Sequence, residues 1–555
     1  MKRGLLLALV IAGCGGQHAR FPARDVMWQD TDKTPVRVPC EKRPSKEDPN
    51  HTACAPDPYV SSNAWDLIDN SLFRPFAKVW AVDPPKEARN VNSFDEVPDS
   101  SWFTNRINRK KPPIEELARG ACKPDDILDP STFGDTVVID QGKPNGASPG
   151  FRVKIGGKKK YMFKTDFEKE PERPSAAAVL GTVFYYAAGF NTSCEQVIYA
   201  DASTFKLTPG LTVTANDGVT RPFDQKALDK LLSKAVKGAD GKVRFQASAW
   251  LKGYLLGPFK YEGTRSDDPN DIIPHEDRRD LRGARLVAAW LHHFDAREQN
   301  SMDAWIASDP KVPDSSPGYV KHHYLDTSDC FGSLWDWERV SREMGHSYLI
   351  DWGHMGADFI TLGVIERPWE REKIAEGHKM FGYYGVDEFD PDGWTNEYPN
   401  PAFGRATEHD NAWMARILSH FDKEDITAIV ALGKFSDPGA TDYLADIIDK
   451  RLQKIVERYL LRLSPIADLA IDGNQMCGID LARRRNARPE AEFRYGATAN
   501  GTPLAVTPKP NGELCITLPP PSEYTIVQIT NGASKGRLDA HLANGKLIGL
   551  ERPDP

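Results

Sequence analysis

The spacing of hydrophobic residues changes several times along the chain, and each change predicts a different element. Trp65, Ile68 and Leu72 recur at helical spacing and predict a helix in the first part of the folded chain. Short β-rich runs follow. The runs at 151–155 and 161–167 flank a Gly-Gly pair, which predicts a hairpin.

A helix is predicted over residues 171–190. Ser175 is placed to cap its first turn, and Gly189 is placed to end it. Its apolar side chains fall on one face, as in a helix that covers a core. These side chains are Val179, Leu180, Val183, Phe184 and Ala187.

Strands resume after this helix and then give way to a helical region and a final β-rich region. Apolar runs predict the strands, helical spacing predicts three helices, and Asn-Gly pairs predict hairpins. The strands are expected at 195–200 and 243–256, the helices at 278–296, 424–433 and 441–463, and the Asn-Gly pairs begin at 500, 511, 531 and 544. Residues 485–555 therefore read as a small antiparallel β module.

Composition narrows the class of protein. The chain has 555 residues, which is too long for one hydrophobic core, so two or more domains are expected. Hydrophobic residues make up 40% and charged residues 27%, as in folded globular proteins. The net charge of −8 and the lack of a long basic run argue against a nucleic-acid polymer as partner.

The first residues resemble the lipoprotein signal of bacteria. Lys2 and Arg3 precede a short apolar run, which ends in Ile-Ala-Gly-Cys at Cys14. The resemblance implies lipidation of Cys14, with residues 1–14 as signal peptide. Glycine at position 15 favours the outer membrane, so we expect a lipid-anchored protein of the bacterial cell envelope. The polar, Pro-rich residues 15–58 are expected to form a tether.

Seven cysteines remain after Cys14. An exported protein can form disulfides, and Cys40–Cys54 and Cys477–Cys515 are the pairs that the sequence suggests. An odd number leaves at least one thiol unpaired, and no metal-type Cys-x-x-Cys occurs.

Residues 293–300 read His-Phe-Asp-Ala-Arg-Glu-Gln-Asn, which resembles the catalytic loop of protein kinases. Asp326 follows at the end of an apparent strand, where kinases keep a metal-binding aspartate. The order of elements is similar to atypical protein-kinase-like folds of the HipA, CotH and phosphatidylinositol-kinase type, and to kinase-like lipoproteins of deltaproteobacteria. The likeness covers roughly residues 95–465.

The resemblance implies an α+β, bilobal protein-kinase-like fold. A β-rich N-lobe is expected at 131–260 and a helical C-lobe at 261–470. An N-terminal extension, 59–130, precedes the lobes, and the small C-terminal antiparallel β module, 485–555, follows them.

The resemblance also implies roles for single residues. Lys164 would hold the α- and β-phosphates of ATP, and Asp295 would accept the proton of the acceptor hydroxyl. Asn300 and Asp326 would supply oxygen ligands to Mg²⁺ or Mn²⁺. The other expected roles fall to His293, which would brace the loop, to Gly146 and Gly150 in the phosphate-covering loop at 142–150, and to Glu172 as partner of Lys164.

The sequence departs from the kinase pattern in several places. Phe294 stands where protein kinases have Arg, and Thr-Ser follows Asp326 in place of Phe-Gly. Asp329 precedes the only nearby Phe-Gly and is a rival metal ligand. Glu168 and Glu170 are rivals of Glu172.

The function expected from this resemblance is transfer of a phosphoryl group from ATP to a hydroxyl of an unknown protein, glycan or lipid. One alternative is a pseudokinase or binding lipoprotein without catalysis. Another is a metal-dependent hydrolase, for which the sequence offers possible ligands in His275, Glu276, His292, His293, His322, His323, Asp326 and Asp329.

Overall fold

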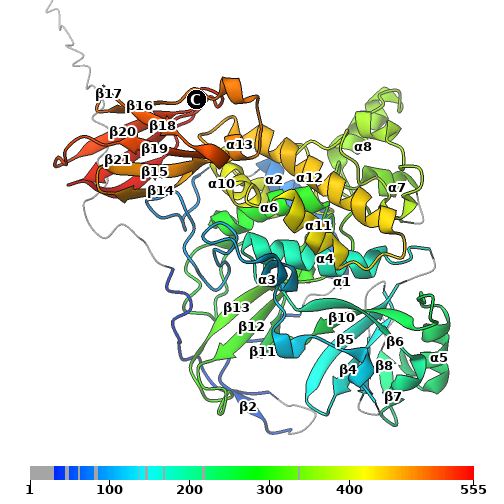
Figure 1. Ribbon diagram of the computed structural model, residues 1–555. Helices are drawn as coiled ribbons and strands as arrows, with labels where there is room; N and C mark the ends of the chain where they lie inside the picture. The colour runs from blue at the N-terminus through cyan, green and yellow to red at the C-terminus, as the bar shows by residue number, and fades with distance from the viewer. Residues whose placement is uncertain are drawn as a thin grey trace, which may run out of the picture.

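The structure is a computed structural model, and it describes residues 30–43, 49–60, 63–80, 86–134, 137–143, 148–166, 169–214, 219–335 and 338–555. Cys14 and the predicted signal segment lie outside these residues, as do Gly146 and Glu168. Several sheets and a large helical body make up the molecule, which confirms the α+β class (Figure 1). Within the described residues, no helix combines the length and the hydrophobicity that a membrane span requires.

A six-stranded sheet holds the first group of predicted strands. Neighbouring strands are antiparallel except the parallel pair β3–β7, and the predicted hairpin is β4–β5. In order across the sheet the strands are β6 (Glu195–Ala200), β10 (Val243–Ala249), β5 (Lys159–Thr165), β4 (Gly150–Ile155), β3 (Val137–Gly142) and β7 (Lys206–Leu207). Phe151, Phe163 and Phe245 pack in its core with Leu228 of helix α5 (Gln225–Ser233). A small separate hairpin is formed by β8 (Thr212–Thr214) and β9 (Thr220–Pro222).

Helix α4 (Arg173–Ala188) lies between this sheet and the helical body (Figure 1). The sequence predicted one buried face, but nearly all of its residues are buried. Gly189 ends the helix as expected, with a positive φ of 124°. Ser175 does not cap it. The helix begins two residues earlier, and the Ser175 hydroxyl instead donates to Asp166.

The helical body contains the other predicted helices. Its core includes Trp290 of α6 and Trp413 of α10, both fully buried. The long helices are α6 (Arg279–Leu291), α10 (Glu408–Leu418), α11 (Lys423–Ala431) and α12 (Pro438–Leu460), and the shorter ones are α3 (Ile114–Arg119), α7 (Glu338–Glu343), α9 (Pro401–Gly404) and α13 (Leu481–Arg484). Asp422 caps α11 through the backbone N–H of Asp425, a capping box that fixes where this helix begins.

A three-stranded antiparallel sheet connects the helical body to the N-terminal residues. It consists of β11 (Tyr254–Gly257), β12 (Ser301–Ala307) and β13 (Gly318–Tyr324). The described residues before position 60 pack against it, including the short hairpin of β1 (Glu41–Lys42) and β2 (Thr52–Ala53). Val38 and Ala55 share a small core with Trp305. The described residues of the predicted tether, 30–43 and 49–58, therefore contact the folded body, and Val38, Ala53 and Ala55 are buried there.

Three disulfides cross-link the described residues. Cys40–Cys54 and Cys477–Cys515 are the pairs that the sequence suggested. The third pair, Cys122–Cys194, was not predicted, because its half-cystines are 72 residues apart and lie in no recognisable pattern. Cys330 is the unpaired thiol, and it is buried.

The C-terminal module consists of two antiparallel sheets around one core, and its first strand begins at Ile466, before the predicted boundary at 485. One sheet holds β14 (Ile466–Asp472), β15 (Gln475–Asp480), β19 (Glu513–Thr517) and β18 (Val506–Pro508). The other holds β17 (Thr502–Leu504), β16 (Gly496–Ala499), β20 (Thr525–Thr530), β21 (Leu538–Ala543) and β22 (Lys546–Glu551). Asn500-Gly501 and Asn544-Gly545 form the tight turns between paired strands, with positive φ at both positions.

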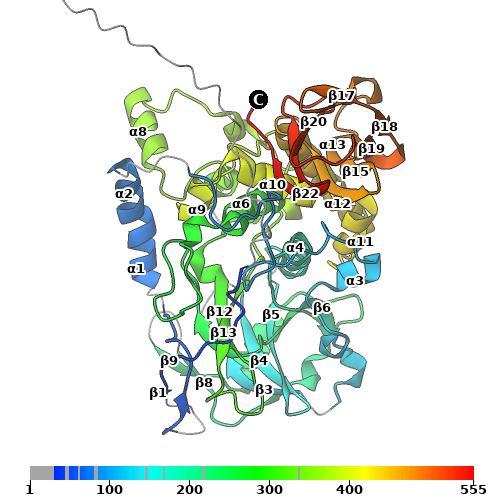
Figure 2. The same cartoon turned by 90° about the vertical axis from the view of Figure 1, so that its left-hand side faces the viewer.

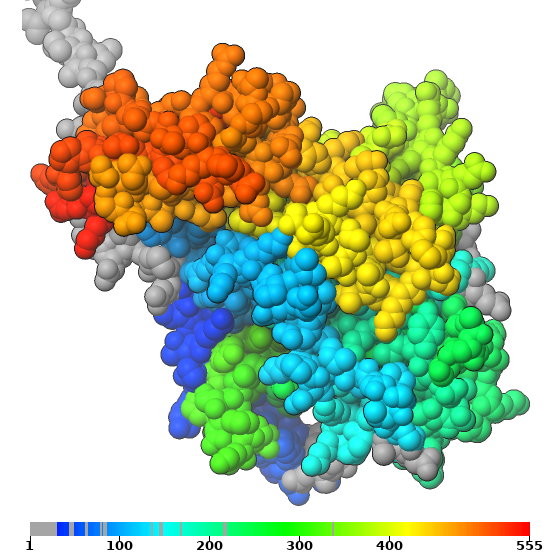
Figure 3. Space-filling view, viewed as in Figure 1, coloured from blue at the N-terminus to red at the C-terminus, as the bar shows by residue number. Residues whose placement is uncertain are grey.

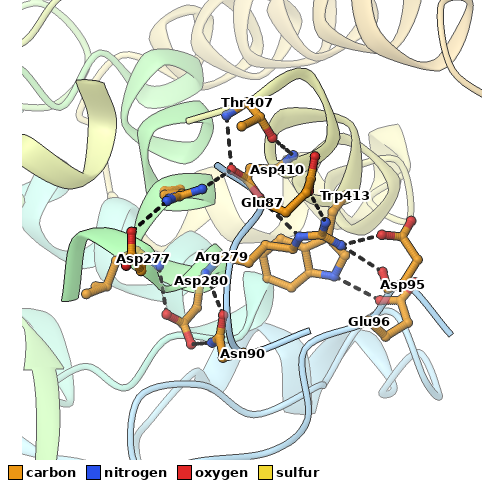
Figure 4. A network of polar contacts seen from close by, with 12 residues as sticks. Glu87, Asn90, Asp95, Glu96, Asp277, Arg279, Asp280, Thr407, Asp410 and Trp413 are labelled. Atoms are coloured by element: carbon orange, nitrogen blue, oxygen red, sulfur yellow. Dashed lines mark hydrogen bonds and ion pairs between the residues drawn. The ribbon is translucent and has the colours of Figure 1, made fainter. Parts of the chain in front are cut away.

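A buried ionic network joins the first turn of α6 to α10 and to the chain around residue 95 (Figure 4). The Arg279 guanidinium donates to Asp410 at 3.1 Å and to Asp95. Arg282 donates to the second oxygen of Asp410 at 3.2 Å, and the Trp413 indole N–H donates to Glu96 at 2.8 Å. Arg278, Arg279 and Arg282 are almost fully buried, and each donates to a carboxylate.

We expect Asp410→Ala to lower the free energy of unfolding by about 3–5 kcal/mol, because it removes the buried carboxylate that Arg279 and Arg282 share and leaves a donor of each guanidinium without its acceptor. Chemical denaturation followed by circular dichroism measures this change. The control is Asp446→Ala, which removes one partner of the exposed pair with Lys450 and should leave stability essentially unchanged. Equal stability of the two variants would contradict a structural role for the network.

Candidate active site

The segment 292–300 forms a compact loop between α6 and β12. His292 ends α6 in the left-handed conformation, with φ 56°. The Asn300 side-chain amide then donates to the carbonyl of Asp295 at 2.8 Å, which fixes the loop's shape. The carbonyl of Asn300 accepts from the N–H of Leu325 at 2.9 Å. Asn300 is thereby held beside the residue that precedes Asp326.

Lys164 and Asp326 form an ion pair, although they are far apart in the sequence. Lys164 lies on β5, Asp326 follows β13, and the Lys164 Nζ lies 3.0 Å from an Asp326 carboxylate oxygen. Burial opposes the charge of Asp326, but the Lys164 ammonium and the Ser328 hydroxyl hold the pKa of this carboxyl well below its usual range. Burial likewise opposes the charge of Lys164, and the carboxylates of Asp326 and Glu195 raise its pKa above the ordinary value.

One cleft of about 760 Å³ collects these side chains. Lys164, Asp295, Asn300 and Asp326 all line it, although they come from three separate stretches of the chain. The Asp295 side chain is 30% exposed and that of Asp326 40%, so a ligand in the cleft can reach both carboxylates. The four residues that the sequence singled out for phosphate, metal and proton chemistry therefore share one solvent-accessible space.

Asp329 and His293 hold the 292–300 loop in place through hydrogen bonds and an ion pair. The backbone N–H of Asp295 donates to Asp329 at 2.7 Å, and His293 Nε2 lies 3.5 Å from the other Asp329 oxygen. His293 Nδ1 bonds the Tyr185 hydroxyl of α4 at 3.0 Å. His293 is 1% exposed and lies behind the cleft wall, so its geometry is that of a positioning residue.

Burial, together with the nearby Asp295 carboxylate and against the pull of His293, raises the pKa of Asp329 to about 6. Asp329 lines the cleft but is tied to the backbone of the Asp295 loop. The Asp326 carboxylate instead bonds the side chains of Lys164 and Ser328. Its side chain is 40% exposed, compared with 18% for Asp329. The geometry thus favours Asp326 over Asp329 as the residue that would bind a cation.

The predicted phosphate-covering loop is described only in part. Gly146 lies outside the described residues. Gly150 pairs with Lys164 in the β4–β5 ladder, and a side chain there would collide with the Phe163 carbonyl at 2.3 Å. Gly150 is therefore required for strand packing next to Lys164, which differs from the expected direct approach to phosphate.

Lys143, at the start of the same loop, was missed by the sequence reasoning. It lines the cleft, and its Nζ donates to the carbonyl of Ser148 at 2.7 Å. Burial and the neighbouring Lys164 lower the pKa of Lys143 to about 8. The prediction for loop 142–150 considered only its glycines. A lysine in such a loop close to another lysine, here Lys164, is itself a signal for anion binding.

Glu172 is not the partner of Lys164, which corrects the sequence prediction. Its carboxylate accepts from the N–H and the hydroxyl of Ser436, on the far side of the α4 N-terminus. Glu170 is paired with Arg173 at 2.8 Å, and Glu168 lies outside the described residues. Glu172 precedes the helix with a positive φ of 67°, and its side chain bonds Ser436 instead of Lys164.

Glu195 takes the position that was expected of Glu172. Lys164 pairs with Gln246 of β10, and Glu195 of β6 pairs with Ser248, so the four side chains share one face of the sheet. The Glu195 carboxylate accepts from Ser248 at 2.6 Å and from Gln246 at 3.0 Å. Strand order, rather than proximity in sequence, brings this glutamate to Lys164, and so no local pattern could have identified it.

Asp295 has a second acidic neighbour in Glu397. Glu397 is 5% exposed, lines the cleft, and has one carboxylate oxygen without a hydrogen-bond partner. Burial, and then the Asp295 carboxylate, raise the pKa of Glu397 to about 9. Arg297 lies 2.7 Å from Asp295 and 3.4 Å from Glu397. The raised pKa favours the protonated form of Glu397 next to the Asp295 carboxylate.

The donor set of the cleft fits a hard cation. Asp326 offers a carboxylate and Asn300 an amide oxygen, which are the ligand types of Mg²⁺ and Mn²⁺. Within the described part of the chain, no group of three or more His, Cys, Asp or Glu side chains is arranged to hold a metal ion. Phosphate oxygens and waters are the usual remaining ligands of Mg²⁺ at a site with one or two side-chain ligands.

The histidines considered for a hydrolase site do not converge. His322 stacks on Trp102 and bonds Asp303, and His275 bonds Asp271. His292 packs near Tyr384 on the opposite side of the loop, where burial lowers its pKa well below the ordinary value. These rings are structural, and the geometry does not support a zinc hydrolase.

Comparisons with known proteins find only distant structural likeness. No family model matches the sequence, and no curated protein matches it. Among solved structures, the Helicobacter pylori proinflammatory kinase CtkA is 11% identical with a TM-score of 0.30, covering 59% of this chain and 97% of that one. The Golgi casein kinase is 11% identical with a TM-score of 0.28, covering 72% and 90% of the two chains.

A further structure, of the Golgi casein kinase with Mn/ADP bound, is 12% identical with a TM-score of 0.26 and covers 72% of this chain and 91% of that one. Similarity at this level carries no inference about the present chain, so the proposals below rest on the geometry of its cleft.

Proposed function

We propose that the protein is a phosphotransferase that moves a phosphoryl group from ATP to a hydroxyl acceptor with the help of Mg²⁺ or Mn²⁺. The observation that carries this proposal is that Lys164, Asp295, Asn300 and Asp326 line one cleft. In the proposed bilobal arrangement, residues 131–260 form the N-lobe and 261–470 the C-lobe. The cleft lies between the β5 strand of the first and the 292–300 loop of the second.

The nucleotide would be held by the cationic side of the cleft. Lys164 and Lys143 line the same space and carry the charge that a triphosphate requires. Asn300 and Asp326 would bind the divalent ion, which when present neutralises charge on the phosphates. Asp326 also keeps Lys164 in place through the 3.0 Å ion pair.

The acceptor would be oriented by Asp295. Its carboxylate lines the cleft beside Arg297, and its backbone is fixed by Asp329 and by the Asn300 amide. A carboxylate in this position can accept the hydroxyl proton as the new O–P bond forms and the bond to the leaving ADP breaks. Protonated Glu397 lies next to it and would limit repulsion between the two acids.

Phosphoryl transfer can be tested without knowledge of the acceptor. Purified protein is incubated with γ-labelled ATP, Mg²⁺ or Mn²⁺ and an envelope extract, and the extract is then separated into protein, glycan and lipid fractions. We expect label in one fraction, dependent on the metal and absent with Asp326→Ala. Absence of metal-dependent label from every fraction, together with a folded protein that does not bind ATP, would favour a non-catalytic scaffold.

Nucleotide affinity should fall between pH 7 and pH 9 because Lys143 loses its proton. Its pKa is lowered to about 8, so a rise in pH through this value removes a positive charge that attracts phosphate. The expected loss is up to roughly tenfold. Lys164, whose pKa is raised, stays charged. Isothermal titration at several pH values measures the affinity. Lys143→Arg should make the affinity nearly independent of pH in this range. If the affinity of that variant fell with pH as in the wild type, Lys143 would not be the titrating group.

We also propose that Cys14 is acylated and anchors the protein to the bacterial envelope, as the sequence of residues 1–14 predicts. Metabolic labelling with a radioactive or alkyne-bearing palmitate should label the wild-type protein, while Cys14→Ser should carry no label. The buried thiol of Cys330 provides the matched control, since Cys330→Ser should keep the label. Label that persists in Cys14→Ser would contradict the anchor.

A further inference from the structure

Two helical segments lie on one side of the molecule (Figure 2). Both present apolar side chains to solvent. The first is continuous and consists of α1 (Asn63–Ile68), a π-helical turn (Asp69–Phe73) and α2 (Arg74–Trp80). The second is α8 (Trp352–Thr361) with the residues that follow it. Exposure is extreme at some positions: Trp80 is 80% exposed, Phe359 83% and Leu362 88%.

The first segment is amphipathic with the reverse of the usual orientation. Asp66, Asn70 and Ser71 are buried against the body, and Arg74 bonds Glu298 at 2.9 Å. Every residue described as exposed between positions 65 and 80 is apolar: Trp65, Leu67, Ile68, Leu72, Phe73, Phe76, Ala77 and Trp80. The sequence predicted the helix, but its apolar stripe faces outward instead of covering a core.

The second segment also turns its polar side chains toward the body and its apolar side chains outward. Asp358 is paired with Arg367 at 2.7 Å, and His354 bonds the Ser347 hydroxyl at 3.0 Å, so the polar groups of α8 are bound to the body. Every exposed residue between 352 and 365 is apolar or glycine, and the large ones are Trp352, Met355, Phe359, Ile360, Leu362, Val364 and Ile365.

The two segments are neighbours. The Trp352 indole N–H donates to the carbonyl of Ser71 at 2.9 Å, which joins the start of α8 to the middle of the first segment. Figure 2 shows α1, α2 and α8 along the same edge of the molecule. We call the exposed apolar residues of both segments the apolar surface. Contiguous exposed patches of this kind mark sites that contact a membrane or another protein.

We propose that the apolar surface docks on the face of a lipid bilayer. Protein–protein interfaces carry about one hydrogen bond per 100–200 Å², whereas lipid hydrocarbon offers no hydrogen-bonding partner. The outward residues of both segments are apolar and their polar groups turn inward, which suits hydrocarbon. Three tryptophans, Trp65, Trp80 and Trp352, belong to the surface, and tryptophan concentrates where bilayers meet water.

The predicted anchor is compatible with this position. Asp30, the first described residue, is bound to Arg278 at 2.7 Å, so the stretch from Cys14 to Asp30 connects an acylated Cys14 to the folded body. That stretch spans at most roughly 50–60 Å when fully extended. Leu67 of the apolar surface also lines the cleft, so a docked bilayer would lie beside the cleft mouth.

The test places an environment-sensitive fluorophore on single cysteines in the full chain. Phe359→Cys and Phe76→Cys report from the apolar surface, and Val312→Cys, 51% exposed in the β12–β13 loop, is the matched control. The labelled proteins are mixed with phosphatidylcholine vesicles, and emission and accessibility to the aqueous quencher iodide are measured. None of the three substitutions removes a buried contact, so folding is preserved.

Vesicles should shift the emission at positions 76 and 359 to shorter wavelength and slow iodide quenching several-fold, while position 312 stays unchanged. Equal behaviour of the three positions, or no association with vesicles, would overturn the proposal. Protection at 76 and 359 without vesicles, increasing with protein concentration, would also overturn it and identify a contact between copies of the chain. No outcome depends on nucleotide or on phosphoryl transfer.

Discussion

Asp295→Asn is expected to reduce phosphoryl transfer by about 10²–10⁴-fold while nucleotide binding persists. The amide cannot accept the acceptor's proton. Its size is that of the carboxylate, and the backbone contacts that hold the loop, from Asp295 N–H to Asp329 and from Asn300 to the Asp295 carbonyl, do not involve the altered atoms. Initial rates of label transfer from ATP measure the effect.

The control for this variant is Asp240→Asn, in an exposed turn of the β-rich part of the chain. It changes the same functional group away from the cleft and should transfer label at the wild-type rate. Transfer by Asp295→Asn within about tenfold of wild type would remove Asp295 from the chemistry. Loss of ATP binding in the same variant would instead assign the residue to nucleotide binding.

Asp326→Asn is expected to lower transfer by roughly 10³-fold and to weaken metal-dependent nucleotide binding as well. Two losses combine, because the substitution removes the carboxylate ligand of the cation and the ionic partner of Lys164 at 3.0 Å. The pKa of Lys164 then falls, since Asp326 is the main group that raises it against burial. Rates measured over a range of Mg²⁺ concentrations separate the two effects.

The neighbouring hydroxyl provides a control for Asp326. Ser328 donates to the same carboxylate at 2.8 Å. Ser328→Ala leaves the Asp326 carboxylate and its ion pair with Lys164 in place, so this variant should retain most of the activity. If Asp329→Asn, rather than Asp326→Asn, abolished the metal dependence, the metal-binding role would pass to Asp329, the rival that the sequence also offered.

Much of the fold could be predicted because local patterns determine it. Alternation in β4 and β5, the Asn-Gly turns at 500 and 544, and the capped helices α11 and α12 all carry their own signals. Helix α4 shows the limit of this reasoning. It is buried on all sides between the sheet and the helical body, so its small and apolar residues have no single face that a periodicity could identify.

The convergence of Lys164 with the 292–300 loop and Asp326 followed from the order of motifs, which places each residue at an element end. Glu195 and Glu397 did not follow, because strand order brings Glu195 to the face of the sheet that holds Lys164, and loop packing brings Glu397 to the cleft. The helical segment 63–80 was predicted, but the direction of its apolar face was not. Its apolar spacing was correct, but spacing cannot tell whether an apolar face meets a core or faces outward.

Isothermal titration of ATP into the protein, with and without Mg²⁺, tests the central claim most directly. We predict one binding site that requires the metal, and loss of binding in both Lys164→Ala and Asp326→Ala. The circular dichroism of both variants should match the wild-type spectrum, because both should keep the fold of the body that Figure 3 draws in space-filling form. Binding that is absent in the wild type, or that survives both substitutions unchanged, would contradict the assignment of this cleft to a nucleotide.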